Sequence, residues 1–199
     1  MVYYTIFLVV FQFFQPWDFS GRIVCVMTIG ILDIQGSVKE HFDMLSRLDV
    51  EAKLVRDNFD GTDGLVLPGG ESTTILSLLK GLPKDLPIFG TCAGAIILKK
   101  LGLLDVEIER NAYGSQLHSF ETSVSVPALG RKAVDAVFIR APKFKKIGGE
   151  VEILAEYESD PVLIRQGKIL AATFHPELTD DTRIHKYFLK IVDEYRGNN

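Results

Sequence analysis

Cysteine is scarce in this sequence, and so are clusters of positive charge. Cys25 and Cys92 are the two cysteines among 199 residues, which excludes a disulfide framework and a zinc site built from cysteines. The net charge is −4 and no run of Lys or Arg occurs, so the sequence indicates neither a nucleic-acid groove nor an anionic membrane surface as partner. We expect small molecules or protein surfaces instead. A reducing cytoplasm is the expected location, because it keeps Cys92 free.

The N-terminal segment lacks the features of a membrane anchor or a secretory signal. Residues 2–14 are almost wholly apolar, but as a helix they would extend about 20 Å against a hydrocarbon core of about 30 Å. A signal would need a basic segment and a small-residue cleavage site, and the one basic residue here is Arg22. Because Met27 opens a regular first strand, we expect residues 1–26 to be a start-site artefact or a disordered extension. A family-specific extension is the alternative.

Strand and helix patterns alternate in the first half of the chain. With 47% hydrophobic residues, the chain can bury one core. Strand patterns occur at residues 28–34, 52–55 and 64–67 and from residue 88, and helical patterns occur at 37–48, at 73–79 and after Cys92. This order predicts a parallel sheet with right-handed crossovers. We therefore expect an α/β fold with one domain over residues 27–199.

The second half of the chain predicts shorter strands with a more alternating pattern. They are expected at residues 106–109, 119–126, 134–139 and 151–157. Gln166–Gly167 predicts a hairpin turn between strands at 161–165 and 168–174. A closing helix is expected over residues 180–195, with an inward face formed by Ile184, Phe188, Ile191 and Tyr195.

Two patterns describe the start and the buried face of the first helix. Ser37 and Glu40 have the S-x-x-E spacing of a capping box, in which the serine hydroxyl accepts a hydrogen bond from the helix. Apolar residues at helical spacing predict the buried face: Val38, Phe42, Leu45 and Leu48.

Residues 88–94, with the sequence IFGTCAG, indicate a short buried strand, a G-x-C-x-G turn and a helix. This is the arrangement of a nucleophile elbow, with sulfur in place of a serine oxygen. Gly90 and Gly94 fit it because a Cβ atom would clash where a strand reverses into a helix. The thiol of Cys92 would be exposed at a helix N-terminus, where the helix dipole favours the thiolate. A buried structural cysteine is the alternative.

A histidine and a carboxylate follow the last predicted strand. In an extended segment residues i and i+2 point to the same side, so His175 and Glu177 are expected to lie together. That suits a triad in which Glu177 orients the imidazole and His175 takes the proton of Cys92. A surface histidine beside an unrelated acid is the alternative. The remaining histidines have no motif nearby: His41, His118 and His185.

The third strand runs directly into Pro68-Gly69-Gly70. Glycines at the carboxyl end of a strand expose backbone N–H groups in the crevice where α/β sheets bind ligands. Because this segment precedes the strand that carries Cys92, Gly70 is a candidate oxyanion donor. An ordinary turn is the alternative.

Several short segments occur together in a characteristic order. They are IGILDIQG (29–36), LPGGEST (67–73), GTCAG (90–94), RNAYG (110–114) with Gln116, SFE (119–121), FIRAP (138–142) and FHPEL (174–178). From Met27 onward the chain thereby resembles the glutaminase subunit of the two-component pyridoxal 5′-phosphate synthases, within the class I, or triad, glutamine amidotransferases. G-x-C-x-G with H-P-E marks the superfamily, whereas GGEST, RNAYG and FIRAP point to this subunit.

The resemblance implies the fold and the site of that family. The fold would be a three-layer sandwich around a mostly parallel sheet with a nucleophile elbow. Cys92 would be the nucleophile, His175 the general base and acid, and Glu177 the group that orients it. Glutamine contacts are implied at Gly70, Glu71, Ser72, Arg110, Ile139 and Arg140, oxyanion donors at Gly70 and Ala93, and a possible activation loop at Gln35.

Free glutamine carries a carboxylate and an ammonium group, which gives these contacts a physical basis. Arg110 or Arg140 could bind the carboxylate, and Glu71 could bind the ammonium group. Both arginines could also be ordinary surface charges. Two positions depart from the family pattern, since Ser115 stands where Arg is usual and Asp33 where a small or apolar residue is usual.

The resemblance also implies the reaction and the partner. L-Glutamine would be hydrolysed to L-glutamate, and the ammonia would pass through a channel into a TIM-barrel synthase subunit in a hetero-oligomer. That subunit builds pyridoxal 5′-phosphate from ribose 5-phosphate and glyceraldehyde 3-phosphate. No metal or organic cofactor is implied for the glutaminase subunit. The alternatives are an amidotransferase subunit of another pathway, a stand-alone cysteine hydrolase, or a non-catalytic subunit that senses glutamine.

Overall fold

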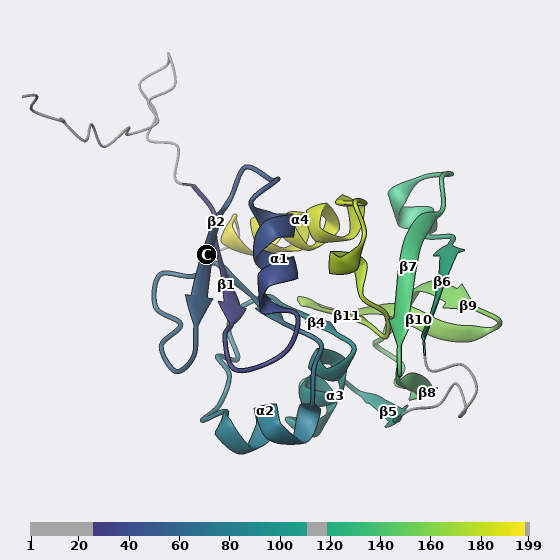
Figure 1. Ribbon diagram of the computed structural model, residues 1–199, viewed down its shortest axis with the longest axis horizontal. Coiled ribbons are helices and arrows are strands. Elements are labelled where there is room, and N and C mark those ends of the chain that lie inside the picture. Colours follow the sequence, from purple (N-terminus) through teal and green to yellow (C-terminus); the bar gives the residue numbers. More distant parts are fainter. Residues whose placement is uncertain (1–25, 111–118, 198–199) are drawn as a thin grey trace, which may run out of the picture.

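The computed structural model describes residues 26–110 and 119–197 (Figure 1). The expectation for residues 1–26 therefore falls almost wholly outside the described residues. The same holds for four residues singled out from the sequence: Cys25, Ser115, Gln116 and His118. Within the described residues, no helix combines the length and the apolar character needed to cross a membrane.

A twisted sheet forms the centre of the described part of the chain, with strand order β2-β1-β3-β4-β11-β10-β9. The strands are β1 (Thr28–Leu32), β2 (Glu51–Val55), β3 (Gly64–Leu67), β4 (Ile88–Thr91), β9 (Glu152–Tyr157), β10 (Asp160–Gln166) and β11 (Ile169–Ala172). The first five in this order pair in parallel, whereas β10 and β9 run antiparallel. The expected mostly parallel α/β sheet and the hairpin at Gln166–Gly167 are confirmed.

Helices cover both faces of this sheet (Figure 1). One face packs against α1 (Val38–Leu45) and α4 (Arg183–Arg196), and the other packs against α2 (Ser72–Leu78) and α3 (Ala93–Lys100). Two separate apolar clusters result, one centred on Phe89 and Phe188 and the other on Leu67 and Leu98. The three-layer sandwich is therefore confirmed.

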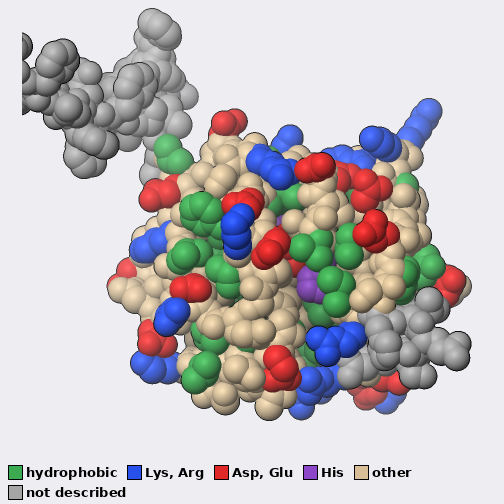
Figure 2. Space-filling view, in the orientation of Figure 1, with side chains coloured by type: hydrophobic (Ala, Val, Ile, Leu, Met, Phe, Trp, Pro, Cys, Tyr) green, Lys and Arg blue, Asp and Glu red, His purple; other side chains and the backbone are tan. Residues whose placement is uncertain are grey.

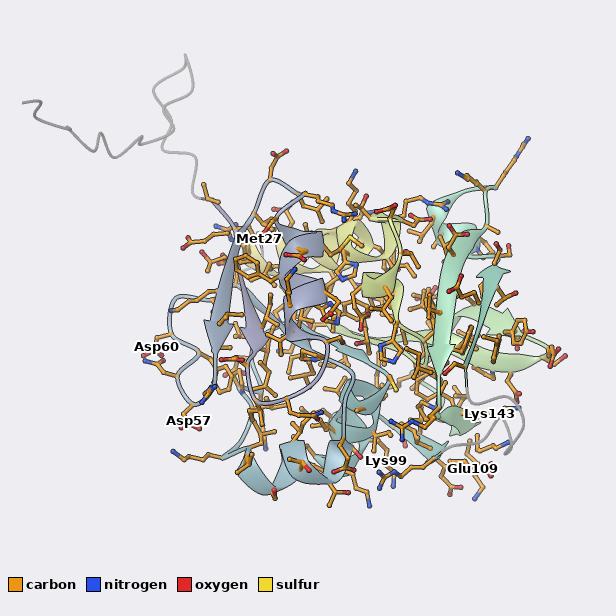
Figure 3. All side chains as sticks on the ribbon, in the orientation of Figure 1. Met27, Asp57, Asp60, Lys99, Glu109 and Lys143 are labelled. Carbon is orange, nitrogen blue, oxygen red and sulfur yellow. The ribbon has the colours of Figure 1, made fainter. Side chains whose placement is uncertain are left out.

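Two small antiparallel sheets extend the fold beyond β11. They pair β5 (Val106–Glu109) with β8 (Lys143–Ile147) and β6 (Ser119–Val124) with β7 (Val134–Ile139). Strand β8 was not expected, because its one fully buried residue, Phe144, lies among lysines. Glu109 and Lys143 are cross-strand partners at the edge of the β5–β8 sheet (Figure 3).

Helix α1 differs from the sequence expectation in two respects. Of the predicted buried face, Leu45 is buried and Val38 and Leu48 pack against the core, but Phe42 is 38% exposed. His41 and Met44 are buried instead of Phe42. The capping box is also wrong, because the side chain of Ser37 makes no capping hydrogen bond. Both differences have the same origin, since Ser37 and His41 are turned toward a carboxylate on another element.

The glycines of the elbow allow β4, α3 and β3 to pack at backbone contact. A Cβ atom at Gly94 would lie 2.1 Å from the carbonyl oxygen of Leu67, and one at Gly90 would lie 2.7 Å from the carbonyl carbon of Gly94. We expect Gly94→Ala to lower the free energy of unfolding by about 3 kcal/mol or more, because backbone atoms must move apart. Urea denaturation measures this change. Gly149→Ala is the matched control, since nothing lies within 4 Å of its added Cβ, and equal stability of the two variants would contradict the prediction.

Candidate active site

Cys92 occupies the turn between β4 and α3. Its φ of 47° and ψ of −103° are rare for a residue other than glycine, as expected of the strained turn in a nucleophile elbow. The backbone N–H of Cys92 donates to the carbonyl of Ala172 on β11, which fixes the turn to the sheet. The sequence predicted an exposed thiol, but the side chain of Cys92 is buried. Cys92 is 8% exposed and lines a cavity instead.

His175 and Glu177 meet as expected, although for a different reason. His175 precedes a short 3-10 helix, η2 (Pro176–Leu178), so the segment is not extended. The turn brings His175 Nδ1 to 2.8 Å from Glu177 Oε1. The backbone N–H of His175 donates to the carbonyl of Val137 on β7, which holds the turn in place.

The imidazole joins the sulfur and the carboxylate. Nδ1 of His175 faces the carboxylate, and Cys92 lies beside the imidazole ring, since an added Cβ at Gly69 would be 2.3 Å from His175 Cε1 and 3.3 Å from Cys92 Cβ. The thiol of Cys92 donates to the carbonyl of Ile139, at 3.9 Å. Cys92, which is far from His175 and Glu177 in the sequence, thus lies beside their hydrogen-bonded pair, as in a Cys-His-Glu triad.

Charge within this chain is set by burial and by the hydrogen bonds. Burial acts to lower the pKa of His175, but its interactions with Cys92 and Glu177 outweigh burial and raise the pKa to about 10. Burial acts to raise the pKa of Glu177, but His41 and His175 hold it well below its usual value. At neutral pH an imidazolium therefore lies between the sulfur and an ionised carboxylate.

A cavity of about 580 Å³ opens beside the sulfur and the imidazole. Every residue that the family resemblance implies for binding or activation lines it: Gln35, Gly70, Glu71, Ser72, Ala93, Arg110, Ile139 and Arg140. The volume suits a molecule of amino-acid size. On the face shown in Figure 2, acidic and basic side chains are interspersed rather than gathered by sign.

The loop between β3 and α2 forms one wall of this cavity and touches the triad. Gly69 packs so closely that an added Cβ would lie 2.3 Å from His175 Cε1 and 3.3 Å from Cys92 Cβ. The loop is held by three hydrogen bonds. Gly69 N–H donates to Thr91 Oγ1, and the carbonyl of Gly69 accepts from Ser37 N–H. Glu71 N–H donates to the side-chain oxygen Oε1 of Gln35.

Glu71 and Arg110 bind one another at the rim of the cavity. The guanidinium of Arg110 lies 3.1 Å from Glu71 Oε1. Backbone N–H groups of Thr74 and Thr73 also donate to this carboxylate and lower its pKa to about 2. A fixed pair of opposite charges at the rim matches the two charges of a free amino acid.

The sequence did not reveal two residues that contact the acid of the triad. Ser37 Oγ donates to Glu177 Oε1 at 2.6 Å, and His41 Nε2 lies 3.4 Å from the same oxygen. The two residues are one helical turn apart, so the sequence could show that they lie on the same face of the helix. Their target was not, because Glu177 lies 140 residues further along the chain.

The remaining expectations concern positions away from the triad. Asp33, which departs from the family pattern, pairs with Arg56 at 3.2 Å on the surface. Among residues 26–110 and 119–197, no group of three or more His, Cys, Asp or Glu side chains is arranged to hold a metal ion.

Known proteins are similar to this chain over about four fifths of its length. The SNO glutamine amidotransferase family matches residues 31–194. The pyridoxal 5′-phosphate synthase subunit PdxT of Thermotoga neapolitana is 51% identical over 187 residues, which cover 83% of this chain and 100% of the relative. The protein of the same name from Francisella tularensis is 50% identical over 176 residues, covering 81% and 97%. A crystal structure of a glutamine amidotransferase superposes with a TM-score of 0.77 at 45% identity, covering 83% of this chain and 98% of that one.

Proposed function

The chain belongs to the SNO glutamine amidotransferase family, and on that basis we propose that it is the glutaminase subunit of a pyridoxal 5′-phosphate synthase. The observation that carries this proposal is the position of Cys92 beside the hydrogen-bonded pair of His175 and Glu177, at a cavity of amino-acid size. The subunit hydrolyses L-glutamine to L-glutamate, and the ammonia is used by a synthase subunit.

The reaction follows from the charges of the triad. The Cys92 sulfur attacks the side-chain carbonyl carbon of glutamine, and a C–S bond forms as the carbonyl π electrons move to oxygen. When the tetrahedral intermediate collapses, the C–N bond breaks and His175 gives its proton to the leaving ammonia. His175 then takes a proton from water, which attacks the thioester and releases glutamate and the thiolate. Glu177 keeps the imidazole oriented throughout.

The negative oxygen of the intermediate needs donors in the same cavity. The backbone N–H groups of Ala93 and Gly70 are the proposed donors, each contributing about 3 kcal/mol to the transition state. Ala93 is the first residue of α3, whose dipole also favours negative charge at this end.

Recognition of glutamine is assigned to residues of the cavity wall. Arg110 and Arg140 supply positive charge for the α-carboxylate, and Glu71 supplies negative charge for the ammonium group. The remaining contacts come from Gly70, Ser72 and Ile139. Substrate binding then replaces the direct pair between Glu71 and Arg110 with contacts to the substrate.

We assign the partner as a TIM-barrel synthase subunit in a hetero-oligomer, which receives the ammonia through a channel. A glutaminase that ran without its partner would waste glutamine, so low activity alone and activation on docking are expected. The loop that contains Gly70 is the element that docking would order. It is linked to Gln35 by the hydrogen bond from Glu71 N–H to Gln35 Oε1. The cytoplasm is the proposed location, because Cys92 must remain a free thiol.

The test is glutamate release by the purified chain with and without the synthase subunit. We expect release to rise severalfold when the partner is added, and the amide nitrogen of ¹⁵N-labelled glutamine to appear in pyridoxal 5′-phosphate. Glutamate release that is coupled to the product of another pathway would assign the chain to a different amidotransferase. Binding of glutamine without release would assign it as a sensor.

A further inference from the structure

Two buried histidines lie behind the triad and do not line the cavity. His41 on α1 and His185 on α4 are fully buried, and so is Thr91 at the end of β4. Burying an imidazole without hydrogen bonds is unfavourable, so the partners of these rings indicate their role.

The three side chains form one connected group next to Glu177. His41 Nδ1 lies 3.1 Å from His185 Nε2, and His41 Nε2 lies 3.1 Å from Thr91 Oγ1. The same Nε2 atom is 3.4 Å from Glu177 Oε1. His41 therefore stands between the acid of the triad and a strand-end hydroxyl.

The surroundings decide where the protons lie. Because Glu177 is ionised, His41 Nε2 must carry a proton, since a lone pair facing the carboxylate would be repelled. His41 Nδ1 then accepts from His185 Nε2–H. Burial, and then the neighbouring His41, lowers the pKa of His185 to about 3, so this ring stays neutral. Its Nδ1, which has no partner among the described residues, is then an acceptor rather than an orphaned N–H donor.

Thr91 extends the group to the cavity wall. Its hydroxyl oxygen accepts from the backbone N–H of Gly69, at 3.1 Å. Gly69 in turn packs against both His175 and Cys92. The imidazole of His41 therefore contacts Glu177 directly and the loop at Gly69 through Thr91. Both the carboxylate and the loop must keep their position relative to the sulfur of Cys92.

We propose that His41 is a positioning residue that holds the carboxylate of Glu177 toward His175. Through Thr91 it also holds the loop that contains Gly69. This inference rests on the proposed glutaminase function. It adds a residue that contacts neither substrate nor sulfur. Its effect on the reaction is exerted through Glu177 and through the loop that contains Gly69.

Two amide variants separate this role from simple support of the core. In His41→Gln the amide nitrogen can reach the place of Nε2, next to both Thr91 Oγ1 and Glu177 Oε1. In His41→Asn the shorter side chain reaches only the place of Nδ1. We expect His41→Asn to lower kcat for glutamate release by about 10- to 100-fold with KM within about 2-fold, a part of the ~10⁴-fold lost when an orienting carboxylate is neutralised. His41→Gln should stay within about 3-fold of the unchanged chain.

The pH profile of thiol alkylation supplies a second measurement that needs no substrate. In a Cys25→Ser background Cys92 is the sole thiol, and its rate with iodoacetamide follows the thiolate. A displaced Glu177 stabilises the imidazolium of His175 less, so we expect the inflection of His41→Asn to move to higher pH. The inflection of His41→Gln should not move.

Thr62→Val is the control for a lost buried hydrogen bond, because its hydroxyl donates to the carbonyl of Phe59 away from the triad. It should lower stability without moving the inflection. Equal kcat and equal inflections for His41→Asn and His41→Gln, or a larger loss for His41→Gln, would overturn the proposal. A different result would refute the glutaminase assignment itself: glutamate release that does not depend on Cys92.

Discussion

We expect Cys92→Ala to reduce glutamate release by at least about 10⁴-fold in an assay with the synthase subunit present. The reason is that no other group can form the thioester, while the oxyanion donors and the binding residues alone leave only weak catalysis. Glutamine binding should persist, because the cavity keeps its charged rim of Glu71 and Arg110. Isothermal titration of the variant with glutamine measures this directly.

Cys25→Ser is the matched control, since it removes the other thiol of the sequence. It should release glutamate at the rate of the unchanged chain. Equal release by Cys92→Ala and by the unchanged chain would exclude the triad mechanism. Glutamine binding without release by either would favour a sensing subunit.

The central strands of the parallel half of the sheet were readable from the sequence because they are buried on both faces. Strand β3 is fully buried and lies between β1 and β4, so its residues form an unbroken apolar run. Strand β8 carries the opposite pattern. Lys145 and Lys146 are exposed and only Phe144 is fully buried, so periodicity could not reveal it.

The members of the triad were predictable, but the geometry that joins them was not. Glycines around Cys92 and the H-P-E motif identify the residues, since each motif has a local chemical meaning. The turn of η2, rather than an extended strand, brings His175 to Glu177, because Pro176 starts a 3-10 helix. Local sequence preference thus gave the right pair for the wrong reason.

The contacts of α1 show where reading from sequence stops. A buried histidine within a helix follows no apolar period, so the predicted face missed His41. Ser37 matched a capping box, yet a buried carboxylate from another element takes its hydroxyl. A charged hydrogen bond is stronger than a neutral cap, so tertiary contact outweighs the local motif.

Glu177→Gln should lower kcat by about 10³- to 10⁴-fold while the fold is retained. The amide is nearly isosteric, but it lacks the charge that, together with Cys92, raises the pKa of His175. If the amide nitrogen faces His175 Nδ1, the imidazole must take the opposite tautomer and can no longer deprotonate the thiol. If the amide oxygen faces it, the tautomer survives but the imidazolium is destabilised. Steady-state glutamate release with the synthase subunit present measures the loss.

Alkylation of Cys92 distinguishes this effect from misfolding. In Glu177→Gln the inflection of the rate with iodoacetamide should move to higher pH, because the imidazolium that stabilises the thiolate forms less readily. Glu152→Gln on the exposed side of β9 is the control, and its kcat and inflection should match those of the unchanged chain. A kcat for Glu177→Gln within about 10-fold of the control would mean that the carboxylate does not orient His175. Ser37 and His41 also converge on that carboxylate, so the same result would mean that neither of them acts on the reaction through it.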